Sequence, residues 1–239
     1  QYKTGKMKFR DKLLTSTELV GTLSSIPVVA QVVNVANKFG PARVVLQKAL
    51  GVYARRQLPE FDSANFRSDA PQSHNHPVRD GKLSPGKVAV FSTCYVNYNE
   101  PGIGHDLLKL LEHNEVPYVV VKGETCCGMP KLELGDLDTV EKYKERNVPL
   151  LHDLARQGYA ILTPVPSCTL MFKAELPLLF ADDARCKAVA EAMYDPFEYF
   201  VLRQKDGLLK TDFKVPLGKI SYHIPCHSRV QNVGKKTEE

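Results

Sequence analysis

Several familiar ligand-binding motifs are missing from this 239-residue sequence. It has no Walker loop and no Gly-x-Gly-x-x-Gly fingerprint, and Gly102-Ile-Gly104 is too short a match to indicate a nucleotide site. It has no Cys-x-x-Cys pair, which zinc sites usually use. No recognised nucleic-acid-binding motif accompanies its basic residues, so no nucleic-acid partner is expected.

Disulfide bonding is not expected for the six cysteines. No signal-peptide pattern opens the sequence, and a chain of this length can build its own core without disulfides. Apolar residues make up 43% and charged residues 25%, which is ordinary for a globular protein. The thiols are therefore expected to be reduced and available to a metal.

The most informative motif that is present is Cys126-Cys127-Gly128. A disulfide between neighbouring cysteines would close a strained ring, so two thiols facing one metal cluster are the better interpretation. Gly128 has no Cβ, which allows an unusual backbone dihedral or a close approach to a bulky cofactor.

Cysteines also follow short apolar runs that are typical of buried strands. The runs Val88–Phe91, Tyr118–Val121, Ala160–Leu162 and Ile220–Ile224 precede Cys94, the Cys126-Cys127 pair, Cys168 and Cys226, respectively. In an open parallel sheet, ligands bind at the carboxyl ends of the strands. We therefore expect these thiols, which are far apart in sequence, to gather at one edge. Cys186 lies on a polar helical segment and is expected to be a bystander.

From Lys87 onward, strands alternate with helical patterns. Helices are predicted at about 105–113, 137–157, 169–175 (ending near Pro177), 184–193 and 196–205, and a last strand opens at Lys219. Asp195-Pro196 is a plausible N-cap followed by proline at the first helical position. This alternation predicts an α/β fold with a parallel, doubly wound sheet.

The N-terminal quarter is helical in pattern and basic. Residues 1–60 contain ten basic and three acidic residues, a net charge of +7. No charge occurs between Glu18 and Lys38, but Pro27 and several polar residues interrupt this stretch, so a membrane span is not favoured. Two interpretations stay open: an amphipathic helix on a membrane surface or an acidic subunit, and a helix packed within its own protein.

Residues 62–86 are predicted to be a linker, because they are rich in Asp, Ser, Asn, Pro and Gly and show no apolar period. The linker contains His74-Asn-His76. A metal site there is conceivable, but no other ligand lies nearby in the sequence, so a solvated loop is favoured.

The arrangement of Cys94, thirty-one residues, Cys126-Cys127-Gly128 and then Cys168 resembles the CCG cysteine-rich domain family. This family includes the B subunit of heterodisulfide reductase and the C subunit of anaerobic glycerol-3-phosphate dehydrogenase. The segment Tyr222–Gly234, with Cys226, resembles the opening of a second copy of the motif. The basic helical N-terminus resembles the segment that follows a ferredoxin-type domain in the C subunit.

The resemblance implies a domain layout for a fragment truncated at both ends. Residues 1–61 are a helical segment after a missing ferredoxin-type domain, 62–86 the linker, 87–216 the first CCG domain (Rossmann-like), and 217–239 the start of the second.

The resemblance also implies a cofactor and a function. The cofactor is an iron–sulfur cluster, of cubane 4Fe-4S or noncubane type, at a site comprising Cys94, Cys126, Cys127, Gly128, Cys168 and Cys226. All of these except Gly128 are metal ligands. The function is electron transfer in a membrane-associated oxidoreductase, from a flavin dehydrogenase subunit to a quinone or similar acceptor. The expected location is cytoplasmic, peripheral on the inner face of the cell membrane.

One position departs from the family pattern. Its Cys-x-x-Cys requires a cysteine at Val165, so the first copy offers four thiols instead of five. A cluster-free domain that docks partner subunits is therefore the alternative function. Zinc and redox-active thiols are alternative interpretations of the site. His223 and His227 flank Cys226 and are either structural or close to a cluster or substrate; Arg229 either balances a cluster's charge or lies at the surface.

Overall fold

Four parallel strands form the centre of the computed structural model, which describes residues 7–216 and 218–233. The strands are β1 (Val88–Val90), β2 (Tyr118–Val120), β3 (Ala160–Leu162) and β4 (Met193–Tyr194), in the spatial order β2-β1-β3-β4. The predicted α/β class with a parallel sheet is therefore confirmed. The sequence did not indicate β4, because its first residue was assigned to the preceding helix.

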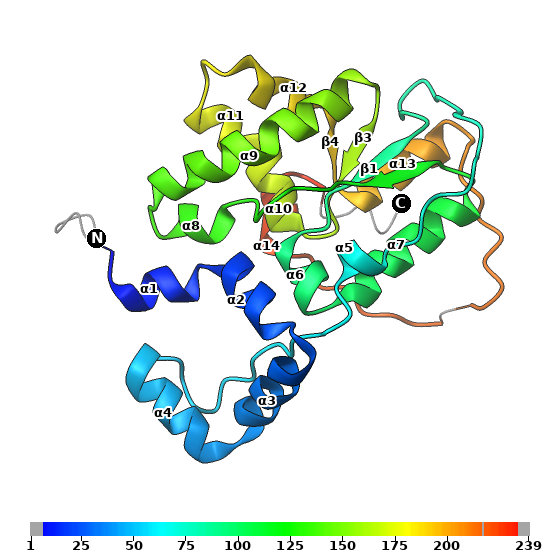
Figure 1. Cartoon of the computed structure of the whole chain (residues 1–239). Coiled ribbons are helices and arrows are strands. Elements are labelled where there is room, and N and C mark those ends of the chain that lie inside the picture. Colours follow the sequence, from blue (N-terminus) through cyan, green and yellow to red (C-terminus); the bar gives the residue numbers. More distant parts are fainter. Residues whose placement is uncertain (1–6, 217, 234–239) are drawn as a thin grey trace.

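Helices cover both faces of the sheet. They include α6 (Cys94–Tyr98), α7 (Pro101–His113), α8 (Met129–Glu133), α9 (Leu137–Arg156), α10 (Pro166–Leu170), η1 (Met171–Glu175), α11 (Leu176–Leu179), α12 (Ala184–Ala192), α13 (Pro196–Lys205) and α14 (Cys226–Val230). Figure 1 shows α9 and α12 on one side of the strands and α7 and α13 on the other.

The two faces of the sheet enter two separate cores. Val88 and Val90 of β1 pack with apolar side chains of α7 and α13, whereas Ala89 and Phe91 pack with those of α9 and α12. Successive residues of a strand point to opposite faces, so a sheet covered on both faces needs apolar residues at every position. The continuous apolar runs seen in the sequence follow from this burial.

The helix boundaries match the sequence patterns, with one informative difference. At the start of α13, the Asp195 carboxylate accepts the Phe197 N–H at 2.9 Å, which confirms the predicted N-cap. Helical structure after β3 was expected to end near Pro177 but continues to Leu179. The π-helical turn η1 places Pro177 in the first turn of α11, where a missing N–H costs little.

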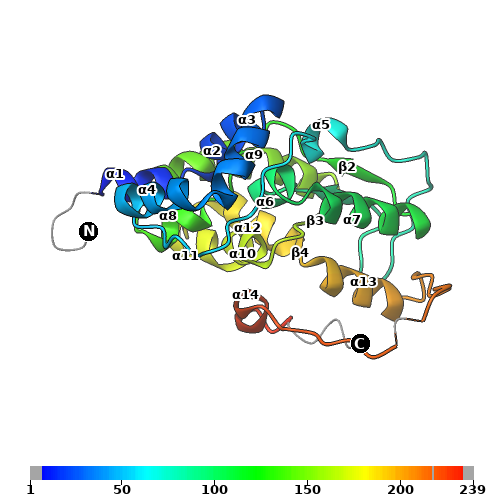
Figure 2. The same ribbon diagram turned by 90° about the horizontal axis from the view of Figure 1, so that it is seen from below.

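The expected strand at Lys219–Ile224 is wrong. The described residues there form no strand, and Ile220 and Tyr222 are exposed. A strand needs a neighbour to satisfy its backbone groups, and none of the four described strands lies beside this segment. The chain instead crosses the surface as an extended loop to α14 (Figure 2).

The segment 62–86 is only partly the unstructured linker that its composition suggested. It contains the short helix α5 (Phe66–Asp69), and the Phe66 ring is fully buried. A Cβ at Gly104 of α7 would lie 2.6 Å from this ring, so only glycine allows the two segments to approach this closely.

The N-terminal part is helical, as predicted, and leaves many apolar side chains exposed. Its helices are α1 (Phe9–Leu14), α2 (Thr17–Ser24), α3 (Pro27–Lys38) and α4 (Gly40–Leu50). Figure 1 shows α3 and α4 standing away from the sheet. The exposed apolar residues of α3, α4 and the residue between them include Val28, Val32, Val35, Phe39 and Val45.

None of the described helices is by itself long and apolar enough to cross a bilayer. Only α2 and α3 taken together reach that length and composition, and they are bent by 107° with respect to each other.

A chain of charges joins α2 to α5 and to the loop after β2. Arg67 of α5 contacts Glu18 of α2 at 2.7 Å and Glu124, in the loop after β2, at 2.8 Å. The Ser92 hydroxyl also donates to Glu124, and Tyr98 donates to Glu18. The Glu124 side chain is completely buried, so its charge depends on Arg67 and Ser92 for compensation.

We predict that Arg67→Ala lowers the free energy of unfolding by about 3 kcal/mol, because removing one partner of a buried ion pair leaves an uncompensated buried charge. Urea unfolding monitored by circular dichroism measures this change. Arg185→Ala is the matched control: Arg185 pairs with Asp183 at a more exposed site, where pairs contribute about 1 kcal/mol or less. Equal losses in the two variants would contradict the role given to Arg67.

Candidate metal centre

The first candidate ligand, Cys94, is the first residue of α6, directly after the loop that follows β1. The preceding residue, Thr93, has a φ of 64°, which is unusual for a β-branched residue. Its hydroxyl accepts the Val96 N–H at 3.2 Å and so caps the helix. This tight turn directs the chain from the strand into α6 and places the Cys94 thiol at the carboxyl edge of the sheet.

The second and third candidate ligands, Cys126 and Cys127, lie in a buried loop held by one amide. The Asn147 side chain, on α9 and fully buried, accepts the Thr125 N–H at 2.8 Å and donates to the Cys126 carbonyl at 3.0 Å. Gly128 follows with a φ of 99°, in the left-handed region that favours glycine. The sequence-based expectation of an unusual dihedral at Gly128 is therefore confirmed.

The fourth candidate ligand, Cys168, lies in α10, just beyond β3. A cavity of about 360 Å³ lies beside Cys168, Cys94 and Cys127. Its other lining residues come from several elements: Thr17, Thr93, Tyr95, Asn99, Met129, Pro130, Glu133, Val165, Ser167 and His227. Val165, where the family pattern has a cysteine, thus faces the same space as the thiols.

The four thiols are close enough to share protons. Hydrogen bonds from Cys127 and Cys94 lower the pKa of the Cys126 thiol to about 3. Thr17 of α2 also donates to the Cys126 sulfur at 3.3 Å. The hydrogen bonds with Cys126, together with burial, raise the pKa of Cys94 well above its ordinary value. One thiolate is therefore stabilised among protonated neighbours, and metal binding must release the remaining protons.

The residues around the thiols form a largely desolvated environment. Burial, followed by the nearby charge of Cys126, raises the pKa of the Tyr143 hydroxyl to about 12, so it stays neutral. The Lys131 side chain is almost fully buried and donates to the Ser16 hydroxyl at 3.2 Å, which ties α8 to the N-terminal segment. α1, α2 and the turn between them thus cover part of the thiol edge.

The structure brings Cys94, Cys126, Cys127 and Cys168 together, with Gly128 shaping the loop that carries two of them. It does not bring Cys226 to them: this residue is exposed, at the start of α14, and is not among the residues lining the cavity. His227, the next residue, does line it, whereas His223 and Arg229 are exposed.

Sequence reasoning missed Thr17 and Asn147. Thr17 is 109 residues from Cys126 and Asn147 is 21 residues away, on a charged helix. No local motif marks either one, because their roles arise only when α2 and α9 pack against the thiol loop.

The donor set fits an iron–sulfur cluster. Soft thiolates select such clusters, zinc or copper(I), and four thiolates satisfy a cubane cluster. The buried thiols surround one side of a cavity whose remaining walls are largely uncharged. Only Val165 lacks a donor atom at a position where the noncubane pattern requires one.

Comparison with known families agrees with this geometry. Residues 88–173 match the model of the cysteine-rich domain called CCG. This part of the chain is therefore a CCG cysteine-rich domain. The matched range begins at β1 and ends in η1, so it includes the four clustered thiols and excludes Cys226.

Three curated relatives show the wider similarity. The chain is 28% identical over 228 residues to the C subunit of anaerobic glycerol-3-phosphate dehydrogenase from Escherichia coli K12, covering 95% of this chain and 55% of the relative. It is 31% identical over 176 residues to the B subunit of fumarate reductase (CoM/CoB) from Methanothermobacter marburgensis (73% and 32%). It is 27% identical over 165 residues to an uncharacterized iron–sulfur protein of Methanocaldococcus jannaschii (69% and 30%).

The chain spans about half the length of the first of these relatives and about a third of the other two. No solved structure is significantly similar to it.

We predict that Cys186 is not a ligand. It is buried in α12, where its surroundings are Asp183, Lys144 and Arg185 and not the other thiols. Cys186→Ala protein should keep the iron content of the wild type, whereas Cys168→Ala protein should lose most of it, because Cys168 lines the thiol cavity and Cys186 does not. Iron analysis of anaerobically purified protein distinguishes the two. Loss of iron from folded Cys186→Ala protein would contradict this ligand set.

Proposed function

We propose that this chain is part of an iron–sulfur electron-transfer subunit of a membrane-associated oxidoreductase. The observation that carries the proposal is that four thiols from three strand ends lie together. Cys94, Cys127 and Cys168 line one cavity, and Cys126 is hydrogen-bonded to Cys94 and Cys127. The relatives named as subunits of a dehydrogenase and a reductase support a place in such a complex. The proposed electron donor is the flavin of a dehydrogenase subunit, and the proposed acceptor is a quinone or similar molecule.

The proposed cofactor of this site is a cubane 4Fe-4S cluster held by Cys94, Cys126, Cys127 and Cys168. Such a cluster supplies one-electron chemistry, with a potential set by charge, hydrogen bonds to sulfur and solvent exposure. A noncubane cluster is disfavoured here because Val165 provides no fifth thiolate. Cys226 is proposed as a ligand of a second CCG site, since it lies outside the first cavity.

Residues of this chain have definable tasks around the four thiols. Thr17 donates a hydrogen bond to the Cys126 sulfur. This hydrogen bond favours negative charge on that sulfur. Asn147 fixes the loop that carries two of the ligands, and Val165 and Met129 keep part of the cavity wall apolar. Electron transfer needs little rearrangement of a site held in this way.

A second candidate function is a cluster-free scaffold that docks partner subunits. Val165 favours it, because the motif is incomplete at that position. The exposed apolar residues of α3 and α4 are consistent with docking in either case.

Iron and sulfide content, together with the visible spectrum of anaerobically purified protein, test the main proposal. Iron bound by the wild type and lost in Cys126→Ala protein supports an electron-transfer subunit, provided that a dithionite-reducible absorbance accompanies it. A folded wild-type protein that holds no iron after anaerobic reconstitution would favour the scaffold.

We predict that Val165→Cys raises the iron bound per chain or changes the cluster type. Residue 165 faces the thiol cavity, so a thiol there adds a donor to the existing four. Iron analysis and electron paramagnetic resonance of the reduced and oxidised protein report both effects. Val165→Ser controls for a polar side chain of similar size, and equal iron content and spectra in both variants and the wild type would contradict the prediction.

The N-terminal helices are proposed to attach the protein to an anionic membrane surface, on the inner face of the cell membrane. The proposal rests on the net charge of +7 in residues 1–60 combined with the exposed apolar residues of α3 and α4. Charge draws the segment to anionic lipid, and apolar side chains then enter the interface.

We predict that the protein co-sediments with anionic vesicles at low salt and is released as salt rises, because exposed charges are screened beyond roughly 8 Å at physiological ionic strength. Binding should fall in a Lys12→Glu, Lys48→Glu double variant. The control is Lys142→Glu, Lys187→Glu, which changes the net charge equally on α9 and α12. Equal binding by the two double variants, or none by the wild type, would show that these helices do not attach the protein to lipid.

A further inference from the structure

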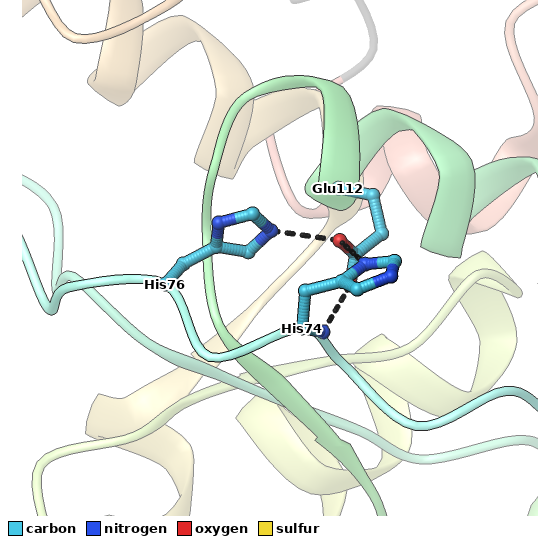
Figure 3. A group of neighbouring side chains, drawn as sticks. All are labelled: His74, His76 and Glu112. Atoms are coloured by element: carbon cyan, nitrogen blue, oxygen red, sulfur yellow. Dashed lines mark hydrogen bonds and ion pairs between the residues drawn. The ribbon is translucent and has the colours of Figure 1, made fainter.

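A second group of metal-ligand side chains lies apart from the cysteines. His74 and His76, in the segment before β1, meet Glu112 of α7 (Figure 3). The three side chains place their ligand atoms within 4.8 Å of one another. The sequence favoured a solvated loop for His74-Asn-His76 because no third ligand lay nearby. Folding supplies one from 36 residues further along the chain.

The Glu112 carboxylate is oriented toward both imidazoles. The backbone N–H of His74 donates to one carboxylate oxygen, Oε1, at 3.0 Å. The other oxygen, Oε2, lies 2.7 Å from Nδ1 of His74 and 2.7 Å from Nε2 of His76. A single oxygen therefore faces two ring nitrogens, and each ring must place a proton on the nitrogen that faces it.

A metal ion can take the place of those two protons. Two ligands of a tetrahedral ion with bonds of about 2.0–2.1 Å lie about 3.4 Å apart, so each of the two distances from Oε2 of Glu112 to a ring nitrogen must open by less than about 1 Å. The His74 side chain is 82% exposed, so it is free to make this adjustment, whereas His76 and Glu112 are each only 21% exposed and form the fixed part of the site.

The surroundings support a built site more than a chance contact. Tyr118 of β2 lies near Glu112: burial, followed by the charge of Glu112, raises the pKa of the Tyr118 hydroxyl to about 12. Its hydroxyl is also 3.4 Å from the Pro71 carbonyl, at the start of the segment that carries the two histidines. The loop thus holds the Glu112 carboxylate through the His74 N–H, and Tyr118 ties the start of that loop to β2.

We propose that His74, His76 and Glu112 bind a divalent transition-metal ion, with Zn²⁺ as the ion the donor set fits best. Two imidazoles and one carboxylate, with a fourth position open to water, form a familiar zinc donor set, and imidazole also suits iron and nickel. The exposure of His74 leaves that fourth position accessible to solvent or to a small ligand.

This site is distant in the fold from the cysteine site. α7 leaves the carboxyl end of β1 and returns to the amino end of β2, and Glu112 is its penultimate residue. Glu112 therefore lies toward the sheet edge opposite the thiols. A metal here would tie the segment between α5 and β1 to α7 and would take no direct part in electron transfer.

The test is Zn²⁺ binding by the full chain, purified anaerobically with its thiol site loaded, and measured by equilibrium dialysis. The matched control is His113→Ala, which removes an exposed histidine that pairs with a single carboxylate, Asp212. The wild type and His113→Ala protein keep the three ligands, and each should bind one more Zn²⁺ ion per chain than Glu112→Gln or His74→Ala protein. If the two site variants still bind this ion, they should bind it at least about tenfold more weakly. His74→Ala changes an exposed side chain, so its folding is not at risk.

Co²⁺ substitution identifies the ligands. Its spectrum should show nitrogen and oxygen ligation without a thiolate charge-transfer band, and the signal should be absent from Glu112→Gln protein. Equal Zn²⁺ binding by wild type and by both site variants would overturn the proposal, as would Co²⁺ bound only through thiolates. In either case the three side chains would form a hydrogen-bonded cluster only.

Discussion

The register of the three longer strands is the constraint on which the thiol site depends. β1 pairs residue for residue with both β2 and β3, so Val90, Val120 and Leu162 lie at one level across the sheet. Each strand has only three residues, and each chain segment leaves the sheet at the same height. A slip of one strand would move its thiol by about 3.3 Å per residue and reverse its buried face. Every residue of β1 and β3 is buried, so a slip of either strand would disturb the packing of both cores as well as the position of its thiol.

The N-terminal helices are part of this arrangement and not an independent appendage. α2 contributes Thr17 to the Cys126 sulfur and Glu18 to the buried Arg67 pair. Arg67 in turn reaches Glu124, two residues before Cys126. A displacement of α2 on binding a membrane or a partner would therefore alter both a hydrogen bond to the thiol set and the charge balance of the loop that carries it. In the proposed function, attachment and redox properties would therefore share these contacts.

The sequence predicted the parts of the structure that depend on local pattern. Apolar runs marked three of the four strands, and the position of each thiol after a strand placed four cysteines at one edge. The fourth run, Ile220–Ile224, alternates apolar and polar residues and has no neighbouring strand among the described residues, and both Ile220 and Tyr222 are exposed. Thr17, Asn147 and Glu112 were not predicted, because each acts on a residue 21 to 109 positions away. Tertiary packing determines such contacts, and the local sequence pattern does not indicate them.

Val165 shows how one residue separates the fold from its cofactor chemistry. It is the residue before α10, adopts an extended backbone and packs against both cores, so the fold accepts an apolar side chain there without distortion. The same side chain faces the cavity beside Cys94, Cys127 and Cys168. A thiol at this position would add a ligand at the cost of some apolar packing, whereas valine keeps the packing and leaves four donors. Stability and ligand number are thus set at one position, and the CCG fold persists whichever of the two is kept.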